Sequence, residues 1–181
     1  MSNQNQIISL LANMRIERQE YVFKFKKGPI DKKYIPDKTS AFGYRELLNP
    51  YTGGTRTGNH LGIDIVGTWH CPIKPIVLNG VIEHKWYVEP GHPTHGGYVV
   101  ILHDDGWRSG YSHLSKIYVK EHDRLIDGFF YREINGRWTK LNTDGILGRQ
   151  GNTGLSEGEH LHLTIKNEKG ELLDPILYVD L

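Results

Sequence analysis

The sequence predicts a mostly β domain with an antiparallel sheet, and three observations lead to this fold class. The chain of 181 residues contains 21 glycines. Many of them bound short runs rich in Val, Ile, Tyr and Trp, as is typical of strands joined by turns. Two pairs of such runs are connected by Asp104-Asp105-Gly106 and by Asn135-Gly136, which are residue types that close β-hairpins. Only one helical pattern stands out, near the N-terminus.

Residues 1–40 are predicted to form an N-terminal extension whose function the sequence does not assign. Ile7, Leu11 and Met14 recur at helical spacing, which favours a short amphipathic helix. Residues 27–40 are rich in Lys and Pro and are expected to be irregular. No signal peptide is recognisable, because the start lacks a basic segment followed by a continuous apolar one.

Residues 41–181 are predicted to form one β-rich domain, with the hairpin at Asn135-Gly136 inserted near 128–145. The runs between the turns are four to seven residues long, a length that suits strands. We expect strands at 62–66, 81–86, 98–103, 107–113 and 161–165.

Composition excludes several classes of protein. The chain has 22 Lys and Arg against 21 Asp and Glu, for a formal charge of +1, so it lacks the basic balance of a nucleic-acid binder. No apolar run approaches the roughly 20 residues of a membrane-spanning helix. A single cysteine, Cys71, cannot form an internal disulfide. These features indicate a globular domain with no nucleic-acid partner and no membrane span.

Ten histidines direct attention to metal chemistry. His160 and His162 alternate with Leu161 and Leu163, so on a strand both imidazoles lie on one face and the leucines on the other. Their Cα atoms would be roughly 6.6 Å apart. One or both can therefore bind a metal, and the spacing alone does not choose between them.

His60 and Asp64 form a second candidate pair. On a straight strand they would lie roughly 13 Å apart, too far to share one ion. We therefore expect a bend supplied by Gly58 and Gly62, with Asp64 on a strand and His60 on the loop before it. Two histidines and one aspartate with an open fourth position form a pattern typical of catalytic zinc.

Four short motifs follow one another between residues 40 and 175. They are Phe42-Gly43-Tyr44-Arg45, His60-Leu61-Gly62-Ile63-Asp64, Tyr111-Ser112-His113-Leu114-Ser115, and Gly151-Asn152-Thr153-Gly154 followed by His160-Leu161-His162. In the residues, order and spacing of these motifs the chain resembles the lysostaphin/LytM-type zinc metallopeptidases of peptidase family M23, which cut peptide bonds in bacterial cell walls.

This resemblance implies a site and a function. His60, Asp64 and His162 would be the ligands of one Zn²⁺ ion, and His113 and His160 would be catalytic beside it. Three protein ligands leave a position for water, whose pKa falls toward roughly 7, and unligated imidazoles can transfer protons and stabilise the tetrahedral intermediate. The implied activity is an endopeptidase acting on peptidoglycan peptides in the cell envelope, either periplasmic or extracellular.

The chain departs from the family pattern at three places. Glu157 and Glu159 stand where the family usually has Thr and Pro; we expect them to be solvated on a loop, the alternative being an effect on substrate charge or on the basicity of His160. His122 stands where the family often has Gly. The insertion at 128–145 is either a wall of the substrate groove or a plain surface hairpin.

Three other interpretations are weaker. Ser156 lies in a Gly-x-Ser-x-Gly pattern, but neither a following helix nor a separate downstream histidine supports a serine hydrolase. His70-Cys71 with His92 and His95 could form a second zinc site, although loop histidines and a buried thiol are the simpler interpretation. The third is a metal-binding but non-catalytic or self-inhibited module of the cell wall. The cross-link that is cut and the oligomeric state cannot be derived from the sequence.

Overall fold

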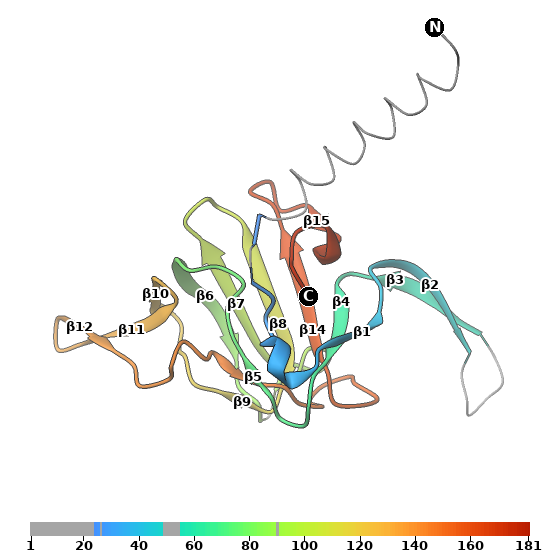
Figure 1. The fold of residues 1–181 in the computed structure, drawn as a ribbon, viewed down its shortest axis with the longest axis horizontal. Helices are drawn as coiled ribbons and strands as arrows, with labels where there is room; N and C mark the ends of the chain where they lie inside the picture. Colours follow the sequence, from blue (N-terminus) through green and yellow to red (C-terminus); the bar gives the residue numbers. More distant parts are fainter. Residues whose placement is uncertain (1–23, 26, 49–54, 90) are drawn as a thin grey trace, which may run out of the picture.

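The computed structural model describes residues 24–25, 27–48, 55–89 and 91–181, and these form a mostly antiparallel β fold (Figure 1). The predicted fold class is confirmed. The helix expected over Ile7 to Met14 lies outside the described residues. The helical elements of the described part are two 3-10 turns, η1 (Lys32–Tyr34) and η2 (Pro175–Leu177). No described helix is long and apolar enough to cross a membrane.

One large sheet organises the domain. Each strand pairs antiparallel with the next in the order β1-β4-β14-β8-β7-β6-β10-β11-β12, and β15 pairs with β14. In that order the strands are Asp37–Ser40, Ile63–Val66, Leu161–Lys166, Arg108–Leu114, Gly97–His103, Gly80–Trp86, Arg124–Ile126, Phe129–Ile134 and Arg137–Lys140, with β15 at Leu172–Leu173.

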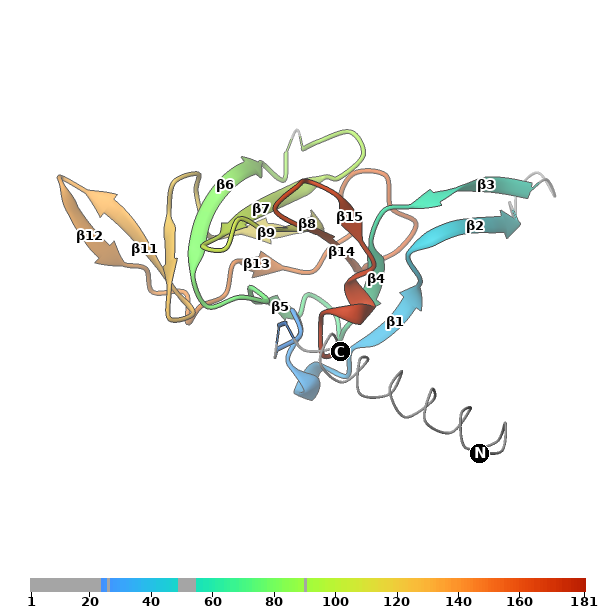
Figure 2. The same cartoon turned by 90° about the horizontal axis from the view of Figure 1, so that it is seen from above.

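Two smaller sheets accompany the large one. A two-stranded sheet consists of β2 (Gly43–Leu48) and β3 (Thr55–His60). A three-stranded sheet has β13 (Gly148–Arg149) between β5 (Pro72–Ile73) and β9 (Lys116–Ile117). Figure 2 shows the β2–β3 and β11–β12 hairpins projecting from opposite ends of the molecule.

The five strands expected between residues 62 and 165 all form, with ends that differ by at most one residue. The turns at Asp104-Asp105-Gly106 and Asn135-Gly136 both join consecutive antiparallel strands, as predicted. The expectation that 27–40 is irregular is wrong at its end, because β1 pairs with β4. β1 carries mostly exposed residues, so no apolar alternation announces it. The division at residue 40 remains a prediction.

Alternation along the central strands separates a core face from a polar face. Ile63 and Ile65 of β4 and Leu161 and Leu163 of β14 are fully buried on one face. The intervening residues carry the polar side chains, as the period of two requires. Phe25 and Ile30 from the N-terminal part, Tyr111 of β8 and Val179 near the C-terminus pack into the same core. The sheet therefore buries one face and presents the other for chemistry.

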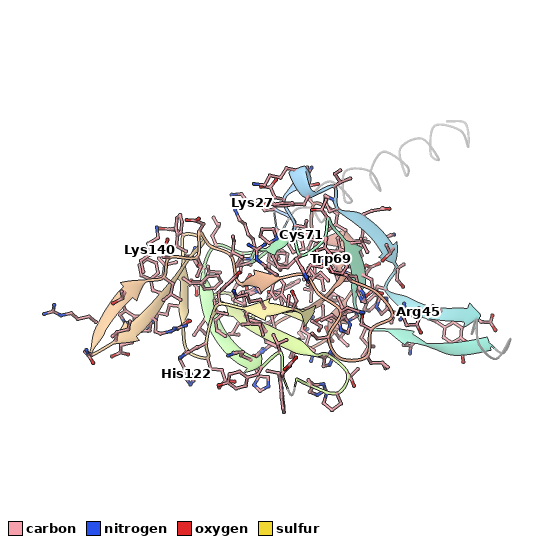
Figure 3. All side chains as sticks on the ribbon, turned by 90° about the horizontal axis from the view of Figure 1, so that it is seen from below. Lys27, Arg45, Trp69, Cys71, His122 and Lys140 are labelled. Atoms are coloured by element: carbon pink, nitrogen blue, oxygen red, sulfur yellow. The ribbon has the colours of Figure 1, made fainter. Side chains whose placement is uncertain are left out.

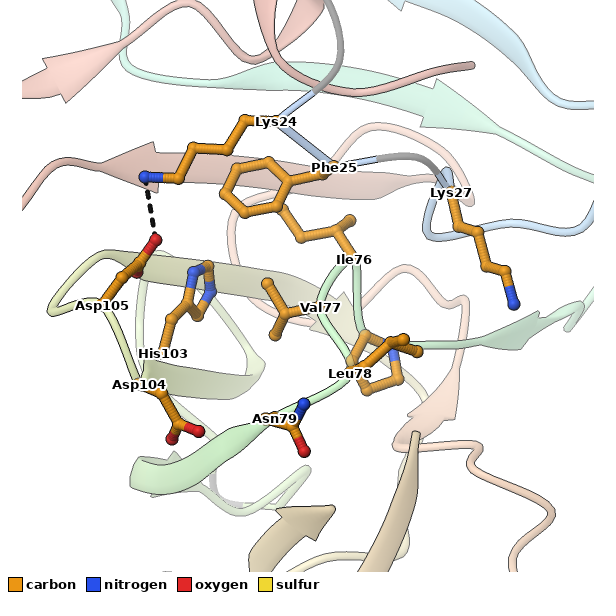
Figure 4. A pocket seen from close by; sticks show the side chains of 11 residues that line it. Lys24, Phe25, Lys27, Ile76, Val77, Leu78, Asn79, His103, Asp104 and Asp105 are labelled. Carbon is orange, nitrogen blue, oxygen red and sulfur yellow. Dashed lines mark ion pairs between the residues drawn. The ribbon is translucent and has the colours of Figure 1, made fainter. Parts of the chain in front are cut away.

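A cavity of about 480 Å³ lies beside Phe25, His103 and the segment 75–79 (Figure 4). His103 is 4% exposed. The Tyr111 hydroxyl accepts the Ile76 N–H (3.0 Å) and shares a hydrogen bond with Ser109 Oγ (3.0 Å), which in turn hydrogen-bonds to His103 Nε2 (2.8 Å). Burial lowers the pKa of His103 from 6.5 to about 4, so its imidazole is neutral at pH 7.

This buried histidine makes stability depend on pH. Between pH 6.5 and 4 the unfolded chain binds a proton at His103 that the native state does not bind. The stabilisation is complete above pH 6.5 and is lost as the pH falls through 4. We expect His103→Gln, whose amide oxygen can still accept from Ser109, to remove about 2–3 kcal/mol of the stability change between pH 7 and 4.5. Urea denaturation at several pH values measures it.

The control is His122→Asn, which replaces an exposed histidine and should leave the pH dependence unchanged. Identical pH dependence in wild type and His103→Gln would contradict the prediction.

Candidate metal and catalytic site

The polar face of the central strands brings the predicted ligands together. His162 of β14 is the direct cross-strand partner of Asp64 of β4, so the two side chains lie on the same face. His60 is the last residue of β3, and the chain turns at Leu61 and Gly62 into β4. The placement of His60 on a loop was therefore wrong: it ends a strand.

Gly62 is required by close packing. A Cβ there would lie 2.3 Å from the Leu163 carbonyl oxygen and 2.9 Å from the His162 ring. Gly58, expected to share the bend, instead lies within β3 with open space around its Cα. The bend is thus confined to two residues, which is what places His60 against Asp64.

Three ligand atoms converge at this point. Asp64 Oδ1 lies 2.8 Å from His162 Nδ1 and 3.1 Å from His60 Nε2, and the two histidine nitrogens are 3.0 Å apart. Zinc–ligand bonds of about 2.0–2.2 Å at tetrahedral angles place ligand atoms about 3.3 Å apart. The triangle therefore fits three corners of a zinc site. It is the one such group found among the described His, Cys, Asp and Glu residues.

Main-chain carbonyls fix the protonation of three imidazoles around the triangle. A carbonyl oxygen can only accept, so each contacting Nδ1 carries a proton, and in the neutral ring the lone pair is then on Nε2. For His60 this is the arrangement that a metal ligand needs. The contacts are His60 to Ala41 (2.7 Å), His113 to Thr153 (2.8 Å) and His160 to Gly158 (2.8 Å).

Asp64 uses its two oxygens differently. Oδ1 faces the histidines, whereas Oδ2 lies 3.6 Å from Arg45 Nη1. Arg45 also donates to the hydroxyl of Ser40, the cross-strand partner of Asp64. Burial opposes ionisation of Asp64, but the contacts with His162 and His60 outweigh it and hold its pKa well below the usual range. Figure 3 shows Arg45 beside the base of the β2–β3 hairpin.

His113 and His160 lie next to the triangle without joining it. The His113 ring is 4.7 Å from the His160 ring and 5.9 Å from the His162 ring. Burial lowers the pKa of His113 to about 4. His113 has a φ of 64°, a left-handed conformation that costs a non-glycine residue energy and often marks functional sites.

The structure places His160 and His162, between which the spacing did not choose, differently. His160 precedes β14 and forms an isolated bridge with Gly151. Its Nε2 is 3.5 Å from Asp64 Oδ1, farther than either nitrogen of the triangle. His162 supplies the converging atom and His160 stands beside it.

Comparisons with curated proteins give two informative relatives, although no family model matches the chain. It is 32% identical over 139 residues to the peptidoglycan DD-endopeptidase ShyA of Vibrio cholerae, covering 76% of this chain and 26% of ShyA. It is 29% identical over 130 residues to the glycyl-glycine endopeptidase ALE-1 of Staphylococcus capitis, covering 71% of this chain and 29% of ALE-1. The chain thus spans less than a third of either relative.

Solved structures agree. A zinc-containing peptidase from Vibrio cholerae has a TM-score of 0.60 and 27% identity, with 87% of this chain and 40% of that chain covered. The catalytic domain of lysostaphin from Staphylococcus simulans has a TM-score of 0.52 and 26% identity, with 77% and 89% covered. The chain belongs to the M23, or lysostaphin/LytM-type, family.

One acidic departure of this M23 domain from the family pattern is structural. Glu157 is exposed as expected, but the Glu159 side chain is only 8% exposed, so its predicted solvation is wrong. Glu159 accepts from the backbone N–H of His70 and from Gln150 Nε2 (3.3 Å). Glu159 directly precedes His160 in the chain, so these hydrogen bonds connect the loop around His70 to the segment that carries His160. Glu159 stood out in the sequence because the family usually has Pro there. Its hydrogen-bond partner, the N–H of His70, is distant in sequence and could not be read from the local pattern.

Two other departures are explained by position. His122 has a φ of 70°, which accounts for the glycine that the family often has there. The inserted hairpin, β11–β12, lies five strands from β14 in the sheet order, about 24 Å at the usual strand spacing. The hypothesis that it walls the substrate groove stays a prediction.

The protonation of His160 argues against the serine-hydrolase interpretation of the pattern around Ser156. Ser156 Oγ lies 3.3 Å from His160 Nδ1, but that nitrogen donates its proton to Gly158 and cannot act as the base. The hydroxyl itself donates to the same carbonyl (2.8 Å). A strand rather than a helix follows, so the M23 domain lacks the required context.

The second zinc site also finds no support. Cys71 is buried, its thiol faces Gln150, and burial together with the charge of Glu159 raises its pKa to about 11. His92 Nδ1 accepts the backbone N–H of His95 (3.2 Å) and so is already engaged. The residues behave as loop histidines and a buried thiol.

The ligand assignment can be tested by metal content. We expect one zinc per chain, and an affinity at least about 100-fold lower in His60→Ala, Asp64→Ala and His162→Ala, because each removes a donor atom. Elemental analysis after dialysis against a competing chelator measures it. The control is His113→Ala, which should keep its zinc. Retention by His162→Ala with loss in His160→Ala would overturn the assignment.

Arg45, which does not belong to the metal-ligand triangle, should affect the zinc affinity of the site through Asp64. Arg45→Gln removes the charge that holds Asp64 Oδ2 and is expected to weaken zinc binding about 10–100-fold, with Arg45→Lys in between. The control is Arg137→Gln on the distant β12. An unchanged affinity in Arg45→Gln would show that Oδ2 needs no partner.

Proposed function

We propose that this chain is a zinc-dependent endopeptidase that hydrolyses peptide bonds in peptidoglycan, in its stem-peptide cross-links or bridges. The observation that carries the proposal is the triangle of His60, Asp64 and His162 with the lone pairs of two further histidines beside it. The names of ShyA and ALE-1, both endopeptidases, support it. We place its action where peptidoglycan lies, in the periplasm or outside the cell.

The three triangle residues would hold one zinc ion, which when bound polarises the scissile carbonyl and lowers the pKa of water. The remaining work falls to His113 and His160. Because burial holds the pKa of His113 near 4, its imidazole is neutral at pH 7. The Nε2 lone pair can take a proton from the attacking water and return it to the leaving amine. The carbonyls of Thr153 and Gly158 keep both rings oriented throughout.

A non-catalytic cell-wall module is the alternative, and one observation weighs against it. A module that only binds has no need for two imidazoles oriented by main-chain carbonyls beside the metal-ligand triangle, whereas a hydrolase needs them. The rigid placement of His113 at a positive φ is an energetic cost that catalysis explains.

The proposal is tested on purified sacculi by mass analysis of the released muropeptides. The zinc-loaded protein should convert cross-linked dimers into products with new peptide ends, which also identifies the bond cut. His113→Ala should retain zinc and lose at least about 100-fold in turnover, while His122→Gly, far from the site, should retain both.

Two results would count against it. Full activity of His113→Ala would remove the assigned role. No release from several wall chemistries by zinc-loaded protein would favour the binding module.

A further inference from the structure

Four rings form a continuous row beside the catalytic histidines. Trp86 meets His92 edge-on with ring centroids 5.2 Å apart, His92 lies 4.8 Å from His95, and His95 stacks on Tyr98 at 4.8 Å with an interplanar angle of 21°. We call these four residues the ring row. None of them takes part in the metal-ligand triangle.

His95 of the ring row lies on the same sheet face as the metal-ligand triangle. His95 Nδ1 is 3.3 Å from Ser112 Oγ. Ser112 is the cross-strand partner of His162, and side chains of such partners share a face. His95 is thus one side chain removed from a proposed ligand.

The two strand residues of the ring row, Tyr98 and Trp86, lie on this face too. A Cβ on Gly110 would meet Tyr98 Oη at 3.0 Å and Thr164 Oγ1 at 2.5 Å. Tyr98 therefore covers Gly110 on the side of Thr164, which is also the side of His162. Trp86 is the cross-strand partner of Tyr98 and 42% exposed. The ring row lies over the ends of β6 and β7, and His95 contacts Ser112 of β8.

The loop that carries His92 and His95 is held by the catalytic loops. The His95 carbonyl accepts the His113 N–H (2.7 Å), and Thr94 O accepts the Leu155 N–H (3.0 Å). Thr153 Oγ1 accepts the Gly97 N–H (2.9 Å). The ring row is thus preorganised relative to His113, which lowers the cost of binding a ligand across both.

The spacing relates the ring row to a peptide. Trp86 on β6 lies three strands from His162 on β14, about 14 Å at the usual strand separation. Four extended residues span about the same length. A stem peptide whose scissile bond lies at the triangle would therefore bring the sugar at its other end near Trp86.

The chemistry of the ring row suits an uncharged ring with amide groups. Two neighbouring charges are engaged, since Glu83 pairs with Arg108 (2.7 Å) and Lys85 lies over Tyr87. His92 Nδ1 accepts two backbone N–H groups, so its proton is on Nε2 and can be donated to a carbonyl. Aromatic faces offer apolar area with fixed geometry.

Resting on the proposed function, we propose that the ring row is a glycan subsite: Trp86 packs against a pyranose ring of the N-acetylated disaccharide that carries the stem peptide, and His92 Nε2–H donates to an acetamido carbonyl. The peptide continues past His95 and Ser112 toward the triangle. The enzyme would then recognise peptide and sugar together.

Calorimetric titration tests this directly. The probes are a disaccharide-tetrapeptide and the same tetrapeptide without its sugars, each added to the zinc-loaded chain. Wild type should bind the sugar-bearing probe at least about tenfold more tightly, which corresponds to about 1.4 kcal/mol. Trp86→Ala should abolish this preference. Trp138→Ala is the matched control, because Trp138 is also 42% exposed but lies on β12.

Equal binding of both probes by wild type would overturn the proposal, as would an equal loss for both probes in Trp86→Ala. Should Trp86→Ala not fold, His92→Ala on the loop replaces it with the same expected loss of preference. Cleavage of a cross-linked peptide dimer is scored separately. A sugar preference without cleavage would reject the proposed endopeptidase and keep the subsite; cleavage without the preference would do the reverse.

Discussion

The hydrogen bonds from three Nδ1–H groups to main-chain carbonyls are the interaction on which this site depends. They come from His60, His113 and His160, and each leaves an Nε2 lone pair available. Carboxylates often perform this orienting role, but here the backbone performs it. The protonation state of the site is therefore set by the course of three loops, and no second buried acid is needed whose own ionisation would compete with Asp64.

A single sheet serves both the core and the chemistry because its strands alternate. In β14 the leucines enter the core while His162 faces outward, and β4 repeats the arrangement with Asp64. Because both faces of these strands are closely packed, glycine occurs where a neighbouring side chain lies directly against the backbone. Gly62 admits the His162 ring and Gly110 admits Tyr98. A methyl group at either position would displace a functional side chain.

Local patterns in the sequence were sufficient for the strands and for the two faces of β14, because alternation is a property of neighbouring residues. The metal-ligand triangle needed a bend, which two glycines suggested and at which only Gly62 lies. Contacts between residues far apart in sequence could not be predicted from local patterns. Glu159 contacts the His70 loop, 89 positions away, and Arg45 lies close to Asp64 only because the β2–β3 hairpin folds back. The remote position of β11–β12 follows from sheet order, which adjacent residues do not encode.

One backbone hydrogen bond links recognition to catalysis. The positive φ of His113 costs about 1–3 kcal/mol, which the contacts of this residue must offset. Its N–H is bound by the carbonyl of His95 and its ring by that of Thr153. The side chain of His95 belongs to the ring row. The same residue that holds His113 in its strained conformation through its backbone therefore contributes a ring to the row through its side chain.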